Sequence, residues 1–385
     1  MTSQLNSESL KKSIEECFGG IPDSRIQKKT AHKLIDIIAI SILATICGAD
    51  GWIGIETYGK AKQNWLSTFL ELANGIPSHD TFARVISRLD SEILEQSFQG
   101  WVKQMTGKLG LEVIAIDGKT LKGSYDREKS LKSLQMVSAW SSRHRLVLGQ
   151  VAVDKKSNEI TAIPVLLEQL DVRQAIVTID AMGTQTAIAQ NIQEAEADYI
   201  LTLKSNHPSL AKEAQSWFED NQHQPDLNNV KVTKVSFEAG HHRIEQRKFW
   251  QVPVELVFTQ NRIKQWRGLR TLVVEESKRI LWNKETSSIR FFLSSLDPQY
   301  DFFPTAIRSH WGIENQLHWC LDVVFTEDKS RIRKDNAPKN MSILRRLALN
   351  LLRQDTSKGS LKMKRYKAGL DDHFLLQILA NSSLF

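Results

Sequence analysis

Two aspartates each follow a short apolar segment in the middle of the chain. Asp117 ends the segment VIAID (113–117), Asp180 ends AIVTID (175–180), and a turn is expected after each. In open α/β sheets, functional groups gather at the carboxyl ends of strands, where loops border a crevice. Carboxylates that converge there repel one another unless a cation neutralises them, and such oxygen ligands select Mg²⁺ or Mn²⁺. The two positions therefore predict a divalent-metal site, whereas a single strand-end aspartate is more often only a helix cap.

A third acid is expected from a later helix, because the chain from residue 302 to 352 is dense in apolar residues. Glu314 borders an apolar stripe at helical spacing, as a carboxylate at the edge of a core would. The stripe consists of Ile313, Leu317, Leu321 and Val324. Asp322 is a rival for the third position.

Two histidines flank Glu314 at helical spacing, His310 at i−4 and His318 at i+4. Packing with Trp311 and Trp319 around the core is the simpler interpretation of these histidines. A His–Glu–His metal face is the alternative, although no HExxH spacing accompanies it.

The composition is that of a globular protein with a mild basic excess. The 385 residues carry a formal net charge of +7, which is compatible with nucleic-acid binding but does not require it. Three scattered cysteines without a CxxC imply neither a disulfide framework nor a cysteine zinc site, so we expect the reducing cytoplasm, with association to the nucleoid. The most apolar run, Leu34 to Cys47, contains Asp36 and is too short for a membrane span.

Residues 1 to about 108 show helical periodicity interrupted by Gly, Pro and Ser clusters. Within GIPSHDTFARVISRLD, Ser78 can cap a short amphipathic helix that carries Arg84 and Arg88 on its outer face. A helix-turn-helix DNA reader has this pattern, and so does an ordinary helical hairpin.

From about residue 111 the pattern changes to strands and then to alternating helices and strands. This order predicts an α/β fold with a mixed sheet flanked by helices. Residues 230–296 are again β-rich, and the chain after Pro304 is helical through Leu352. The remaining expected elements are a hairpin of 135–140 and 146–153, helices at 162–170 and 184–195, and a strand at 198–204.

Three strings in order carry a specific resemblance: AIDGKTLKGS, TIDAMGTQ, and IRSHWGIENQLHWCLDVVFTEDKSRIRKDNAPKNMSILRRLALNLL. They closely resemble the ISAs1-family transposases, and IPDSR and GIPSHDTFARVISRLD resemble that family's N-terminal domain. The resemblance covers nearly the whole chain and implies a DDE transposase with an RNase H-like catalytic domain. It makes Asp117, Asp180 and Glu314 the first, second and third catalytic acids, which are also the metal ligands.

The resemblance also implies a domain organisation. Residues 1–108 would be a helical transposase-associated domain with a role in DNA binding. Residues 109–355 would be the RNase H-like catalytic domain, interrupted by a β-rich insertion at about 207–300. Residues 356–385 would form a basic C-terminal tail and helix.

One part of the family signature is incomplete here. Related insertion-sequence transposases carry Y-(2)-R-(3)-E-(6)-K around the third acid. His310 stands where the arginine would be, and Leu321 stands where the lysine would be. The nearest basic candidates are Arg308, Lys329 and Arg331.

As a hypothesis, Asp117 bridges two Mg²⁺ or Mn²⁺ ions, and Asp180 and Glu314 each complete one site. One cycle would hydrolyse a strand at the element end, and a second would join that end to target DNA. The implied partners are double-stranded DNA, as terminal inverted repeats and target, and a second copy of the chain in a synaptic complex.

Basic residues elsewhere are expected to hold the DNA backbone, although a charge run is more often a solvated face and a polar hairpin tip needs no ligand. The candidates are Lys119, Lys122, Arg84, Arg88, His241, Arg243, Arg308, Lys329, Arg331 and Arg333. Two other functions stay open: a transposase-derived DNA-binding protein without turnover, and an RNase H-fold nuclease that lacks strand transfer.

Overall fold

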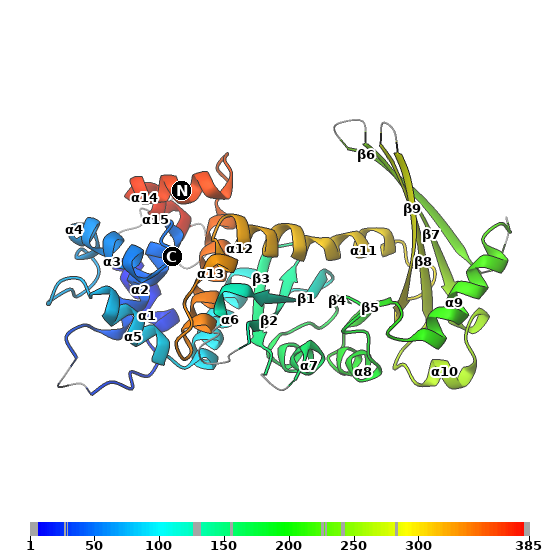
Figure 1. The fold of residues 1–385 in the computed structure, drawn as a ribbon, viewed down its shortest axis with the longest axis horizontal. Coiled ribbons are helices and arrows are strands. Elements are labelled where there is room, and N and C mark those ends of the chain that lie inside the picture. The colour runs from blue at the N-terminus through cyan, green and yellow to red at the C-terminus, as the bar shows by residue number, and fades with distance from the viewer. Residues whose placement is uncertain are drawn as a thin grey trace.

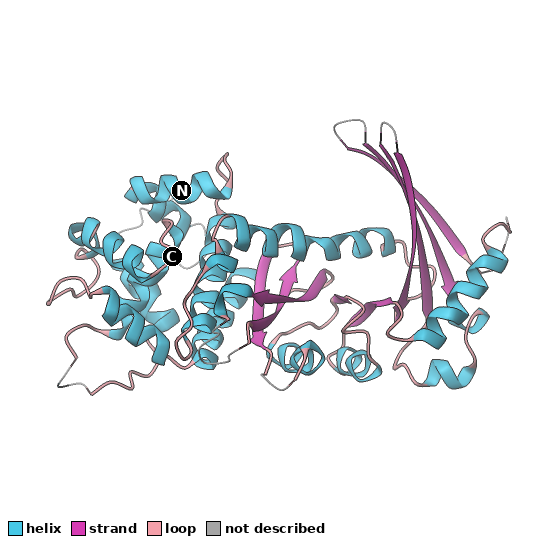
Figure 2. Cartoon of the chain, viewed as in Figure 1, coloured by secondary structure: helices cyan, strands magenta, loops and turns pink. Residues whose placement is uncertain are grey.

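A nine-stranded mixed sheet with the order β3-β2-β1-β4-β5-β9-β8-β7-β6 runs from the middle of the computed structural model to one end (Figure 2). The structure describes residues 7–380 except 27, 29, 126–131, 155–156, 225–226, 228, 240–242 and 282–283. The strands are β1 (Val113–Leu121), β2 (Leu134–Ser141), β3 (Leu146–Ala152), β4 (Ile176–Ile179), β5 (Asp198–Leu203), β6 (Lys231–Ala239), β7 (Arg243–Pro253), β8 (Thr271–Leu281) and β9 (Lys284–Ser294).

The first five strands form the predicted RNase H-like core. β1 pairs antiparallel with β2 and parallel with β4, and β4 pairs parallel with β5. All four residues of β4 are buried, as expected for a parallel strand covered on both faces. Helices α7 (Glu159–Gln169) and α8 (Thr186–Glu194) cover one face, and α11 (Phe303–Gly312) lies along the other (Figure 1).

One strand differs from the sequence-based expectation. β1 does not end at Asp117 but continues to Leu121. Its parallel pairing with β4 stops at Ile116, opposite Ile179, whereas its pairing with β2 runs on to Leu134. Asp117 therefore lies where one neighbouring strand ends and the other continues, which leaves its backbone ordered and one side of the strand open.

The β-rich segment joins the central sheet. It begins with α9 (Pro208–Asn221), and β6 to β9 then form an antiparallel meander with η3 (Val254–Leu256) and α10 (Gln260–Lys264) between β7 and β8. β9 pairs antiparallel with β5, so the meander extends the core sheet (Figure 1).

The N-terminal part is helical, as predicted, and α2 lies buried within it. The Leu34–Ile46 helix is apolar enough to form a core, and all but Ile35 of its residues are buried. Among the residues that the structure describes, no helix combines the length and apolar character that a membrane span requires. The helices are α1 (Ser7–Phe18), α2 (Leu34–Ile46), α3 (Trp52–Ala61), α4 (Gln63–Leu66), α5 (His79–Arg88) and α6 (Ser91–Thr106).

The C-terminal helices pack against this N-terminal group (Figure 1). They are α13 (Ala337–Gln354), α14 (Leu361–Leu370) and α15 (Asp372–Ala380). Part of the basic C-terminal run is buried and structural. Lys364 pairs with Asp355 at 2.9 Å, and Arg365 pairs with Asp50 at 3.3 Å and donates to the carbonyl of Thr45 at 2.9 Å.

Candidate active site

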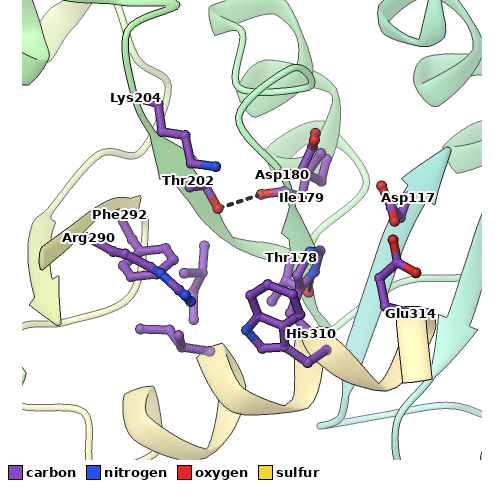
Figure 3. A pocket seen from close by; sticks show the side chains of 13 residues that line it. Asp117, Thr178, Ile179, Asp180, Thr202, Lys204, Arg290, Phe292, His310 and Glu314 are labelled. Atoms are coloured by element: carbon purple, nitrogen blue, oxygen red, sulfur yellow. Dashed lines mark hydrogen bonds between the residues drawn. The ribbon is translucent and has the colours of Figure 1, made fainter. Parts of the chain in front are cut away.

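The three predicted acids line one cavity of about 280 Å³ on the core sheet (Figure 3). Asp117 comes from β1, Asp180 directly follows β4, and Glu314 comes from the helical segment on the sheet's open face. Asp117 and Glu314 point toward one another in Figure 3. Segments far apart in the sequence thus bring together the carboxylates that sequence reasoning selected.

Asp117 is more buried than Glu314, with a side chain that is 16% exposed. Burial, together with the nearby charges of Asp180, Glu314 and Glu159, raises its pKa to about 7, against the lowering effect of a hydrogen bond from the backbone N–H of Gly118. A carboxyl group held in this way gains from a neighbouring cation, because a cation offsets both the burial and the repulsion.

Asp180 caps the turn that follows β4. Its Oδ1 accepts hydrogen bonds from the backbone N–H groups of Met182 at 3.1 Å and Gly183 at 3.3 Å. Asp180 therefore both caps this turn and lines the cavity. The turn leads into α8 and fixes the aspartate at the carboxyl end of β4.

Glu314 lies in a π-helical turn, η4 (Ile313–His318), between α11 and α12 (Trp319–Val323). Such turns are rare and frequently occur at functional sites. The Glu314 side chain is 53% exposed, and Nδ1 of His318 lies 3.5 Å from its Oε2. This contact with His318 is the largest influence on the Glu314 carboxyl and lowers its pKa.

The histidines do not pack with tryptophans in the core, so that interpretation is wrong. Trp311 and Trp319 are 43% and 57% exposed. Nδ1 of His310 lies 3.0 Å from Oγ1 of Thr178, at hydrogen-bond distance, so this ring is tied to β4. His318 is buried, and its Nδ1 lies 3.6 Å from Oδ2 of Asp117 as well as near Glu314.

Asp322, the rival third acid, is engaged elsewhere. Both of its carboxylate oxygens lie 2.7 Å from Nζ of Lys119. Lys119 also contacts Asp328 at 3.4 Å, and Lys122 pairs with Asp328 at 2.8 Å. The two lysines expected to meet phosphates are thus held by carboxylates in this structure, and their DNA contacts stay predictions.

The donor set fits a hard divalent cation. One ligand atom from each of Asp117, Glu314 and His318 lies within 4.8 Å of the other two, and Asp180 lines the same cavity. Carboxylate oxygens suit Mg²⁺ and Mn²⁺, and a bound cation would offset both the burial and the neighbouring negative charges that raise the pKa of Asp117.

Two charged side chains that line the cavity and a third beside Gly118 were missed by sequence reasoning. Lys204, just after β5, and Arg290, on β9, line it on the side of the view opposite Asp117 (Figure 3). Glu159, at the start of α7, lies against Gly118, and burial followed by the charge of Asp180 raises its pKa. Lys204 could have been found, since it ends an expected strand as Asp180 does. Only the fold brings Arg290 to the cavity and Glu159 to Gly118.

The remaining predicted DNA-binding residues are spread over several surfaces. Arg84 and Arg88 are exposed on α5, whose N-terminus Ser78 caps as predicted. Arg308 is exposed on α11, Arg243 begins β7, and His241 lies outside the described residues. A second cavity, of about 810 Å³, lies between N-terminal helices and the segment after α12, and its lining includes Lys329, Arg331, Arg333, Trp52 and His79.

Family models and known proteins match most of this chain. Residues 108–351 match the family described as Transposase DDE domain, and residues 15–102 match the family described as DDE_Tnp_1-associated. YhhI of Escherichia coli (strain K12), named as a candidate H repeat-associated transposase, is 39% identical over 382 residues, covering 97% of this chain and 99% of that one.

YncI of Escherichia coli O157:H7, named as a candidate transposase, is 41% identical over 376 residues, covering 96% of this chain and 95% of that one. A solved piggyBac transposase synaptic complex with hairpin DNA aligns with a TM-score of 0.45 and 11% identity, over 95% of this chain and 77% of that one. From the matches to the catalytic-domain family and to the two bacterial relatives, the chain belongs to the DDE transposase family.

Proposed function

We propose that this transposase cleaves DNA strands at the ends of an insertion sequence and joins them to target DNA, with Asp117, Asp180 and Glu314 as its catalytic acids. The observation that carries the proposal is their convergence in one cavity from β1, β4 and η4. Two Mg²⁺ or Mn²⁺ ions are the proposed cofactors. When bound, such ions activate a water or a DNA 3′-hydroxyl and stabilise the leaving oxygen of a displacement at phosphorus.

The protein's own groups support this chemistry by position and charge. Asp117 is held by an ordered strand and lies close enough to Asp180 and Glu314 for their charges to raise its pKa. Lys204 and Arg290 line the same cavity and offer cationic partners for a phosphate beside the acids. Acidic ligands and basic phosphate contacts on one cavity favour a phosphodiester substrate over an uncharged one.

We also propose a path for the DNA backbone. Lys329, Arg331 and Arg333 follow the catalytic helical segment and share a cavity with Trp52 and His79 of the N-terminal helices. A duplex that contacts this cavity would meet both the proposed DNA-binding domain (residues 1–108) and the catalytic domain (109–355). We propose further contacts by Arg84, Arg88, Arg243 and Arg308, and we propose that two copies hold two element ends together.

A donor-end cleavage and joining assay tests the proposed function. Purified full-length protein is incubated with duplexes that carry the two ends of the element, a target plasmid and Mg²⁺. We expect nicking and joined product from the wild type, and neither from Asp117→Asn, which loses a charge at the centre of the acid cluster. Asp171→Asn is the matched control. Asp171 lies on the loop before β4, at the end of this strand opposite Asp180, and the variant should retain both activities.

Each other outcome points to a different function. DNA binding without cleavage would support a transposase-derived binding protein. Cleavage without joined product would support an RNase H-fold nuclease. Substantial Mg²⁺-dependent nicking by Asp117→Asn would overturn the assignment of that residue.

A further inference from the structure

His318 is buried beside the acid cluster on the same π-helical turn as Glu314. The whole residue is 4% exposed, and its side chain enters the site from the helical segment opposite β1. Nδ1 lies 3.5 Å from Oε2 of Glu314 and 3.6 Å from Oδ2 of Asp117. The ring thus directs one nitrogen between two carboxylates of the proposed metal site.

These separations fit a shared ion better than direct hydrogen bonds. A nitrogen–oxygen hydrogen bond usually spans about 2.7–3.2 Å, so both contacts are long. Two ligand atoms that each lie about 2.1 Å from one ion, at tetrahedral or octahedral angles, are roughly 3.0–3.4 Å apart. Shifts of a few tenths of an ångström would let Nδ1, Oδ2 of Asp117 and Oε2 of Glu314 surround one cation.

The other ring nitrogen leaves Nδ1 as the atom through which this ring makes its polar contacts. Nε2 of His318 is buried and has no hydrogen-bond partner among the described residues. A buried imidazole that lacks such a partner is costly unless something else compensates for its burial. The contacts of Nδ1 with the two carboxylates therefore give the reason for a polar ring at this buried position.

His310 offers an internal comparison. It lies two turns of helix before His318, also lines the acid cavity, and its Nδ1 is at 3.0 Å from Oγ1 of Thr178. That nitrogen has a partner on β4, and His310 is not in the group of ligand atoms that lie within 4.8 Å of one another. The two histidines that flank Glu314 therefore differ in the bonding open to them.

We propose that His318 is a nitrogen ligand of one of the two divalent ions, through Nδ1, together with Asp117 and Glu314. The proposal rests on the proposed function, because it adds a ligand to that metal site. An imidazole ligand is softer than a carboxylate, so it shifts the preference of this site from Mg²⁺ toward Mn²⁺. The second ion then keeps an all-oxygen environment with Asp180.

Pulsed electron paramagnetic resonance of bound Mn²⁺ tests the ligand directly. The full-length protein is loaded with Mn²⁺ alone, and electron spin-echo envelope modulation is recorded for ¹⁴N coupling. We expect one histidine coupling in the wild type and in His310→Gln, and its loss in His318→Gln. Calorimetric titration should show at least a tenfold weaker Mn²⁺ affinity in His318→Gln and a smaller loss for Mg²⁺.

The outcomes separate this proposal from the function on which it rests. Mn²⁺ binding that depends on Asp117 but shows no nitrogen coupling would overturn the role of His318 and leave the metal site standing. Absence of Mn²⁺ binding, or binding unchanged in Asp117→Asn, would overturn the metal site itself. If His318→Gln does not fold, the wild type and His310→Gln are both labelled with ¹⁵N-histidine. Both proteins must then show the ¹⁵N pattern, in which the histidine coupling to Mn²⁺ comes from ¹⁵N. Loss of that pattern in His310→Gln would assign the coupling to His310 and overturn the proposal.

Discussion

Lys119 and Asp322 form an ion pair that joins the strand of the proposed catalytic aspartate to the helical segment of the proposed catalytic glutamate. Nζ of Lys119 lies 2.7 Å from both carboxylate oxygens of Asp322, and the lysine side chain is only 8% exposed. Lys119 is two residues beyond Asp117, and Asp322 lies on α12, directly after the π-helical turn. The pair therefore fixes β1 against the element that carries Glu314.

The ion pair predicts different effects for the two candidate third acids. Asp322→Asn should lower the free energy of unfolding by about 1–2 kcal/mol, because it leaves a buried lysine with a weaker partner. Glu314→Gln should change it by less than about 1 kcal/mol, because the side chain is 53% exposed. Urea unfolding measures both values, and the cleavage assay should show loss of activity in Glu314→Gln alone, scored at a temperature where both variants are folded.

The reverse result would exchange the two roles. A stable Asp322→Asn protein without cleavage, beside a Glu314→Gln protein that still cleaves, would make Asp322 the third acid. It would also mean that Lys119 must leave Asp322 before a metal binds.

The raised pKa of Asp117 predicts a pH-dependent effect on stability without metal. Its folded pKa of about 7 lies above the unfolded value, so the folded wild type loses stability as the pH rises from the unfolded pKa to the folded one. Asp117→Asn removes that loss. The variant should be similar to the wild type near pH 4 and more stable at pH 8 by on the order of 2 kcal/mol. Chemical unfolding in the presence of a chelator at both pH values measures the difference.

Asp171→Asn serves as the opposite-sign control. The hydrogen bond and charge of Arg173 lower the pKa of Asp171, so its ionised form is favoured in the folded protein. That variant should show no gain at pH 8. A stability difference for Asp117→Asn that is the same at both pH values would contradict the pKa assignment.

Local sequence patterns predicted most of the core because its strands are short, apolar and buried. The residues of β4 are apolar or small, and Asp180 follows them directly, so the apolar pattern alone marks both the strand and its end. The extension of β1 beyond Asp117 was not predicted. GKTL is not a typical strand sequence, and its strand conformation depends on pairing with β2 from Gly118↔Val137 to Leu121↔Leu134.

The site was predictable where chemistry follows the local chain and not where it depends on distant partners. Asp117 and Asp180 could be selected from their own segments. The contact between Lys119 and Asp322 joins residues 203 positions apart, and Glu159 meets Gly118 through the packing of α7. His318 was correctly placed beside Glu314, but only the fold brings its ring to Asp117.

Two glycines near Asp117 should respond differently to alanine. A Cβ on Gly123 would lie 2.1 Å from the backbone oxygen of Ser330, which cannot move without its loop, so Gly123→Ala should cost roughly 1–3 kcal/mol. A Cβ on Gly118 would lie 2.1 Å from Oε1 of Glu159, the mobile end of a side chain. Gly118→Ala should therefore cost less, and its cost should largely disappear in a Glu159→Ala background, as a double-mutant cycle of urea unfolding measures.

The contact between Gly118 and Glu159 also affects the charges of the neighbouring aspartates. Gly118→Ala should displace the Glu159 carboxylate and remove its influence on the Asp117 and Asp180 charges. Equal costs for the two alanine variants, or a Gly118→Ala cost that persists without Glu159, would show that the neighbouring backbone and not this carboxylate limits the position.

The basic segment after α12 should contribute to the salt dependence of DNA binding. Lys329 and Arg331 are exposed and line the cavity of about 810 Å³ that also includes N-terminal residues. If each contacts one phosphate, its replacement by alanine should lower the slope of log K against log [salt] by roughly 1, because fewer counterions are released. Fluorescence anisotropy with element-end DNA over a range of salt concentrations measures the slope. Arg173→Ala removes the same charge from the loop before β4 and should leave the slope unchanged. An equal change of slope in all three variants would show that net charge alone sets it. An unchanged slope in Lys329→Ala and Arg331→Ala would show that the DNA does not contact this cavity.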